Sequence, residues 1–155
     1  MHGVNTDWRC LPVPAADAET LIPLLHDAEE DDDRIRAALR DPTCRGYVAR
    51  AGSEPVGAAV MRWSDQPELL YLAVAATARR RGHGRRIVAA LQAELPPGRT
   101  MLVGTANCAL DNIAFYQRCG FRMHSVKRDY FAYIDPPLTE NGIPMQDMIV
   151  FSYEP

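Results

Sequence analysis

A cluster of glycine and positive charge lies at residues 79–86, where an apolar run gives way to a helical pattern. The segment reads RRRGHGRR, so five arginines flank two glycines. A helix that begins after a buried strand presents backbone N–H groups at its first turn, and glycines let a ligand approach the main chain. Arginine adds charge-assisted hydrogen bonds to phosphate. The pattern therefore predicts an anion site whose natural ligand is a diphosphate.

The spacing does not fit two common nucleotide motifs. No Lys-Ser/Thr pair follows the second glycine, and no third glycine completes G-x-G-x-x-G. Two alternatives stay open: the glycines form only a turn, or the arginines form a solvated face or a nucleic-acid patch. The formal net charge of -3 and the lack of aromatic residues among the arginines disfavour binding to nucleic acid.

This junction needs a strand before it and a helix after it. Glu68–Val74 reads ELLYLAV, a nearly continuous apolar run that is typical of a strand buried on both faces. A helical apolar stripe follows the glycines and ends at the PPG of residues 96–98. The stripe consists of Ile87, Val88, Leu91 and Leu95.

The remaining elements follow from hydrophobic period and from turn residues. Strands are predicted at 8–13, 45–51, 55–63, 101–106, 121–134 and 147–153, and the GSE of residues 52–54 predicts a hairpin between the second and the third. Helices are predicted up to Ala28, with either a kink at Pro23 or a start near Thr20, and also at 31–40 and at 110–119. This order predicts an α/β (α+β mixed) fold, a mixed sheet with helices on both faces. No linker or repeat divides the chain, so we expect a single domain spanning 1–155.

Composition sets the class of protein. The chain is 47% hydrophobic and 24% charged, as in an ordinary globular domain. Its cysteines form no C-x-x-C pair, and no apolar run approaches the roughly 18 residues of a membrane span. We expect a soluble, reduced, cytoplasmic protein that binds no metal and no membrane. The cysteines are Cys10, Cys44, Cys108 and Cys119.

Val74–Gly84 resembles the acetyl-CoA signature of the GNAT N-acetyltransferase superfamily, a strand valine followed by [RQ]-x-x-G-x-[GA]. The resemblance implies a GNAT-like domain with a central, mostly antiparallel sheet splayed at the middle, and acetyl-CoA as co-substrate. Ala76 and His83 replace the usual proline and aliphatic residue, and neither change removes a backbone donor. We expect His83 to face solvent or phosphate rather than to catalyse. The implied pantetheine and diphosphate contacts are Leu72, Ala73, Val74, Arg79, Arg80, Arg81, Gly82, His83, Gly84 and Arg85.

Asn112–Phe121, NIAFYQRCGF, resembles the second GNAT signature, a helix with a tyrosine that ends in glycine and an aromatic residue. The resemblance implies that Tyr116 protonates the thiolate of CoA, a general-acid role. A packed aromatic is the alternative for this residue. The family often has asparagine seven residues before the tyrosine and alanine four before it, and these places hold Ala109 and Asn112 here, with a further asparagine at Asn107. The sequence therefore does not choose between Asn107 and Asn112 as the asparagine that contacts the cofactor.

The general base and the acceptor site are less defined. Glu68 stands where some family members place a catalytic glutamate, with a water relay as the alternative. The acidic run Glu29–Asp33 either attracts a cationic amine or caps a helix as a solvated face. The loop Asp135–Asp147 is a candidate acceptor wall because proline and Asn-Gly give it a defined shape. Its ENGI…DM ending resembles a bacterial GNAT group of unassigned substrate.

Together these features predict an N-acetyltransferase that moves an acetyl group from acetyl-CoA to a primary amine by direct attack in a ternary complex. The acceptor is a small molecule or a peptide. One alternative is a non-catalytic acyl-CoA-binding sensor domain, and another is an acetyltransferase of protein N-termini or lysines. A homodimer is compatible with the sequence.

Overall fold

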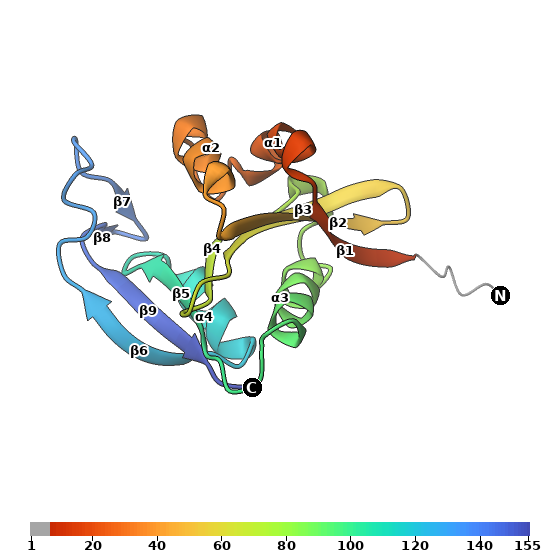
Figure 1. Cartoon of the computed structure of the whole chain (residues 1–155). Helices are drawn as coiled ribbons and strands as arrows, with labels where there is room; N and C mark the ends of the chain where they lie inside the picture. Colours follow the sequence, from red (N-terminus) through yellow and green to blue (C-terminus); the bar gives the residue numbers. More distant parts are fainter. Residues whose placement is uncertain (1–6) are drawn as a thin grey trace. The chain divides into compact units, whose positions relative to one another are not determined.

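The computed structural model describes residues 7–155, which fold into two compact units. The first unit ends at Glu94, and the second spans Leu95–Pro155. Each unit combines antiparallel strands with helices, which confirms the predicted mixed α/β class (Figure 1). One domain over 1–155 stays a prediction. No helix within residues 7–155 is long and apolar enough to cross a membrane.

The first unit contains four strands, each antiparallel to the next. They are β1 (Trp8–Val13), β2 (Cys44–Ala51), β3 (Glu54–Arg62) and β4 (Glu68–Val74). The β2–β3 connection turns at Gly52, where φ is 64°. A positive φ favours glycine, so the predicted hairpin forms at the expected place.

A β-bulge interrupts the pairing of β3 with β4. Val60 pairs with Tyr71 and Met61 with Leu69, which leaves Leu70 as an extra residue of β4. A bulge locally re-aims side chains. Leu70 and Tyr71 accordingly pack against the same apolar cluster instead of alternating between the two faces.

The helices α2 and α3 lie close to their predicted positions. The acidic run contributes Asp31, whose side chain accepts a hydrogen bond from Asp33 N at 3.0 Å and caps α2 (Asp32–Arg40). A 3₁₀ turn, η2 (Ala76–Ala78), follows β4 and leads to α3 (His83–Ala93). Because α3 ends at Ala93, the predicted stripe residue Leu95 follows the helix instead of belonging to it.

The helix predicted up to Ala28 is divided and shorter. A 3₁₀ helix, η1 (Ala15–Leu21), runs directly into α1 (Ile22–Leu25). Pro23 lies in the first turn of α1, where the missing N–H has no helical partner to lose. The proline is therefore compatible with the start of a helix at this point and not with the middle of a longer one.

Helices cover both faces of the first unit's sheet. Ala58 and Val60 pack in a cluster with residues of η1, α1 and α2. On the opposite face, a Cβ added at Gly57 would lie 2.8 Å from Ile87 Cδ1 of α3. The picture agrees, with α1 and α2 on one side of these strands and α3 on the other (Figure 1).

The second unit has three strands paired in one sheet, a small separate hairpin and one helix. β9 (Met148–Tyr153) lies between β5 (Met101–Ala106) and β6 (Arg122–Lys127) and is antiparallel to both. The helix α4 (Leu110–Arg118) ends before Gly120, whose φ is 92°. A left-handed glycine after the last turn is a common helix terminator and was predicted here.

The predicted strand 121–134 is wrong beyond Lys127. Asp129 adopts a left-handed φ of 57°, and Asp129 N donates to Asp147 Oδ1 at 2.9 Å, so the chain turns away from the sheet. A small hairpin follows, made by β7 (Thr139–Glu140) and β8 (Ile143–Pro144). The aromatic residues of this segment raised its apparent strand propensity, and a long-range hydrogen bond overrides it. Residues 128–147 form the β6–β9 loop.

The close approach of α3 to β3 gives a test of packing. A methyl group at Gly57 would lie 2.8 Å from Ala73 O and 2.8 Å from Ile87 Cδ1. We expect Gly57→Ala to lower the free energy of unfolding in urea by about 1–3 kcal/mol, the usual cost of overpacking. Thr77→Ala, at an exposed position, is the control and should change it little. Equal stabilities for the two variants would contradict this packing.

Candidate functional site

The junction between β4 and α3 adopts left-handed backbone at two residues. Arg80 has a φ of 64°, and Gly82, the N-cap of α3, has a φ of 79°. A Cβ at Gly82 would meet no atom within 4 Å. Glycine is therefore required here by backbone conformation and not by crowding, and the space beside its Cα is open.

The first turn of α3 presents backbone donors. The first helical bond runs from Arg86 N to Gly82 O at 3.1 Å, so the amides of His83 and Gly84 precede the helical ladder. The helix dipole adds partial positive charge at the same end. This end of α3 has the geometry of a phosphate site, as the sequence predicted.

Arg79 is engaged by the protein itself. Its guanidinium forms an ion pair with Asp27, in the turn after α1, and its Nε donates to Val74 O at 3.3 Å. These contacts join the end of β4 to the α1–α2 connection. Arg79 therefore stabilises the junction, a contribution that its place in the motif did not reveal.

His83 has a partner that the sequence did not identify. Trp8 Nε1 of β1 donates to His83 Nδ1 at 3.2 Å, and the guanidinium of Arg86 lies 4.3 Å from the centroid of the Trp8 ring. The bond to Nδ1 leaves the neutral ring's proton on Nε2. His83 is half-buried rather than fully solvent-facing. A lone tryptophan far away in the sequence offered no signal for this contact.

Residues 72–74 of β4 pair with β3. Their partners are Ala59 for Leu72, Ala58 for Ala73 and Gly57 for Val74. Glu68 lies at the other end of the same strand, and its Oε1 is 3.6 Å from Arg62 Nη1. The candidate base thus begins β4 and forms an ion pair with the opposite residue of β3.

The acidic run Glu29–Asp33 is largely used in local contacts. Asp31 caps α2, and Glu29 Oε1 accepts from Asp31 N at 3.1 Å. Asp32 Oδ1 lies 2.6 Å from His26 Nε2, and Asp33 Oδ1 lies 3.3 Å from Arg36 Nη1. These contacts support the helix-capping alternative for the run.

In the second unit, Tyr116 lies on α4 within an aromatic cluster. Its ring is 8% exposed and meets the rings of Phe115, Phe121 and Phe151 at centroid distances of 5.2, 5.7 and 6.2 Å. Burial raises the pKa of the Tyr116 hydroxyl above its usual value of 10, with a smaller contribution from Cys119. The hydroxyl therefore stays protonated throughout the physiological pH range.

The two candidate asparagines have different partners. Asn112 Nδ2, on α4, donates to Thr105 Oγ1 of β5 at 3.4 Å. Asn107 directly follows β5, and its side chain bonds to the backbone of the β6–β9 loop. Within residues 7–155, no group of three or more His, Cys, Asp or Glu side chains could hold a metal ion.

Comparison with known proteins gives consistent matches. Residues 7–121 match the Acetyltransferase (GNAT) family. The uncharacterized N-acetyltransferase YvbK of Bacillus subtilis is 30% identical over 136 residues, which cover 84% of this chain and 86% of that relative.

Solved structures are similar over nearly the whole chain. An acetyltransferase of Bacillus subtilis in complex with CoA has a TM-score of 0.84 and 27% identity, covering 96% of this chain and 99% of its own. A GNAT acetyltransferase of Elizabethkingia anophelis with acetyl-CoA bound has a TM-score of 0.81 and 28% identity, covering 96% and 98%.

These matches confirm the family that the two sequence motifs indicated, together with its fold. The family match includes the β4–α3 junction and α4, the two segments that carried the resemblance. The chain belongs to the GNAT family of acetyltransferases, and its class of enzyme is an acyltransferase.

Proposed function

We propose that the protein transfers an acetyl group from acetyl-CoA to a primary amine by direct attack in a ternary complex. The observation that carries the proposal is the left-handed Gly82 before α3, with open space at its Cα and the amides of His83 and Gly84 ahead of the helical ladder. Solved relatives at 27% and 28% identity hold CoA and acetyl-CoA, which supports the same co-substrate here.

The proposed contacts divide between backbone and side chains. Main-chain N–H groups of Arg80–Arg85 bind the diphosphate, and the backbone of Leu72–Val74 aligns the pantetheine arm. Arg81 and Arg85 add positive charge to the diphosphate site. We assign Arg79 a supporting role because its guanidinium is already paired with Asp27. Holding the thioester in one position lowers the entropic part of the barrier.

The chemistry needs one proton donor and one proton acceptor. The amine nitrogen attacks the thioester carbonyl carbon, the C–S bond breaks, and the sulfur leaves as a thiolate. Because an ammonium nitrogen has no free lone pair, the acceptor must lose a proton, to water or to Glu68, before its nitrogen can attack. We propose that Tyr116, protonated at working pH, donates its hydroxyl proton to the thiolate. The packed-aromatic alternative is supported by the three ring contacts.

The acceptor is a small amine or a peptide amine. Two further fold relatives are a ribosomal-protein alanine N-acetyltransferase and a spermidine N-acetyltransferase, at 17% and 15% identity. At such low identity these relatives support the fold only. The choice between a small amine and a peptide amine as acceptor is therefore left to the experiment. The sensor alternative requires CoA binding without any transfer.

The test of the function is an acetyl-CoA-dependent screen of small amines and of peptides with free N-termini or lysines. We expect release of free thiol that requires both acetyl-CoA and an amine, with an acetylated product of the matching mass. Tight binding of acetyl-CoA without transfer to any amine would favour the sensor. Lack of acetyl-CoA binding by the folded protein would refute both.

Gly82→Glu should abolish binding of acetyl-CoA and of CoA. The substitution places a carboxylate beside the proposed diphosphate and strains the left-handed backbone. Gly98→Glu is the matched control, because Gly98 has a φ of 76° and equally open space. Calorimetry should detect binding by the control only, with thermal melting to verify that both variants fold. If a folded Gly82→Glu variant binds acetyl-CoA with unchanged affinity, the cofactor site lies elsewhere.

Tyr116→Phe should lower kcat by roughly 10²-fold, the lower end for general-acid catalysis, because it keeps the packed ring and removes the proton. Acetyl-CoA affinity and melting temperature should change little. Since burial raises the pKa of Tyr116, wild-type kcat should not fall between about pH 8 and 10 through loss of this proton. Full turnover by a folded Tyr116→Phe variant would show that Tyr116 is not the proton donor and that it serves in packing.

A further inference from the structure

The β6–β9 loop is fastened to the end of β5 by one residue. Asn107 Oδ1 accepts from Gln146 N at 2.9 Å and from Asp147 N at 3.1 Å, and its Nδ2 donates to Pro144 O at 3.0 Å. The backbone adds a fourth bond, from Asn107 N to Asp147 O at 2.9 Å. The side chain of Asn107 therefore bonds to three residues at the end of the loop, and its backbone bonds to one of these, Asp147, a second time.

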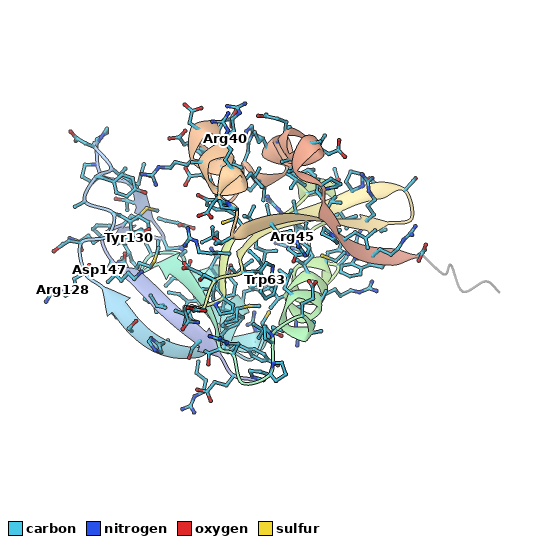
Figure 2. All side chains as sticks on the ribbon, in the orientation of Figure 1. Arg40, Arg45, Trp63, Arg128, Tyr130 and Asp147 are labelled. Carbon is cyan, nitrogen blue, oxygen red and sulfur yellow. The ribbon has the colours of Figure 1, made fainter. Side chains whose placement is uncertain are left out.

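The same end of the loop is tied to its beginning. Asp147 Oδ1 accepts from Asp129 N at 2.9 Å, and Phe131 N donates to Gln146 O at 3.0 Å. Figure 2 shows Arg128 and Tyr130, at the start of the loop, beside Asp147 at its end. Asn107 thus holds the end of the loop, and the bonds from Asp129 and Phe131 join the beginning of the loop to that end.

Apolar packing supports the inner side of the loop. Cys108 is fully buried beside Ala106 and Ala109, and the loop residues Phe131, Ile143 and Met145 pack against them. Asn141 Nδ2 adds a bond to Cys108 O at 3.0 Å. The loop is consequently a shaped surface with its own small core.

Exposed aromatic and apolar side chains lie on the outer side. Tyr130, Tyr133 and Leu138 are exposed to 43%, 53% and 51%. The rings of Tyr130 and Tyr133 also meet the ring of Phe131, at centroid distances of 5.0 and 6.5 Å, which holds them in place. The exposed parts of the three side chains form an apolar and aromatic outer surface.

The bonding capacity of the Asn107 side chain is nearly filled. A side-chain amide oxygen accepts two hydrogen bonds, and both are made here by loop N–H groups. Only one N–H of the amide nitrogen has no bond to the loop. This arrangement suits a residue that orders the loop better than one that contacts the cofactor, the role for which the sequence left Asn107 and Asn112 as alternatives.

We propose that Asn107 is a positioning residue that holds the β6–β9 loop as the acceptor wall and thereby sets affinity for the amine, not for acetyl-CoA. The inference rests on the proposed acetyl transfer. It also implies that the amine has an apolar or aromatic body, which the exposed Tyr130, Tyr133 and Leu138 can contact.

The test compares Asn107→Ala, Asn107→Asp and the control Gln117→Ala. The Gln117 amide donates only within α4, to Ile113 O, as far as the described contacts show. We expect Asn107→Ala to raise the acceptor KM about 10-fold, because two loop N–H groups lose their acceptor, with little change in acetyl-CoA affinity. Asn107→Asp keeps the accepting oxygen, so it should raise the acceptor KM less than Asn107→Ala does. Gln117→Ala should match wild type.

Hydrogen exchange supplies a readout that needs no substrate. Peptides that cover residues 144–147 and 129–131 should exchange faster in Asn107→Ala than in wild type, with β5 itself unchanged. Weaker acetyl-CoA binding with unchanged exchange would overturn the proposal and make Asn107 a cofactor contact. Faster exchange with an unchanged acceptor KM would also overturn it.

Failure of the function itself is separately visible. A wild-type protein that acetylates no amine refutes the proposed function and, with it, the acceptor role of the loop. In that case the exchange and acetyl-CoA binding data still distinguish a clamp on the loop from a contact to the cofactor.

Discussion

The left-handed turn between β4 and α3 is the constraint on which the first unit depends. Gly82 must take a positive φ so that α3 begins with its amides ahead of the helical ladder. Three contacts far apart in sequence stabilise this turn: Asp27 pairs with Arg79, Trp8 bonds to His83, and Ile87 packs beside Gly57. Residues of β1, the α1–α2 connection and β3 thus all support one short segment.

The second unit depends on polar bonds at its most irregular segment. Its irregular β6–β9 loop lacks the repeated backbone pairing of a sheet, so its backbone groups need side-chain partners. Asn107 and Asp147 supply them, at 2.9 to 3.1 Å. Such bonds are directional, which fixes the conformation of a loop that has few buried side chains of its own.

Local patterns predicted much of this structure. Gly52 and Gly120 marked their turns, the apolar period located α3, and the motifs at residues 79–84 and 112–121 indicated the family. The misses have a common cause: Trp8 with His83, Asp27 with Arg79, and Asn107 with the loop are contacts between residues far apart in sequence. Strand propensity at 128–134 was likewise overridden by Asp129 bonding to Asp147. A single sequence does not show directly which distant residues are in contact.

The division of the β6–β9 loop into an inner and an outer side has an evolutionary consequence. Phe131, Ile143 and Met145 pack inward, whereas Tyr133 and Leu138 are exposed to 53% and 51%, although the Tyr133 ring also meets that of Phe131. Exposed positions tolerate substitution at little cost in folding free energy. Relatives that keep the base of the loop can therefore change its outer side chains, and with them the molecules that the loop contacts, without loss of the fold.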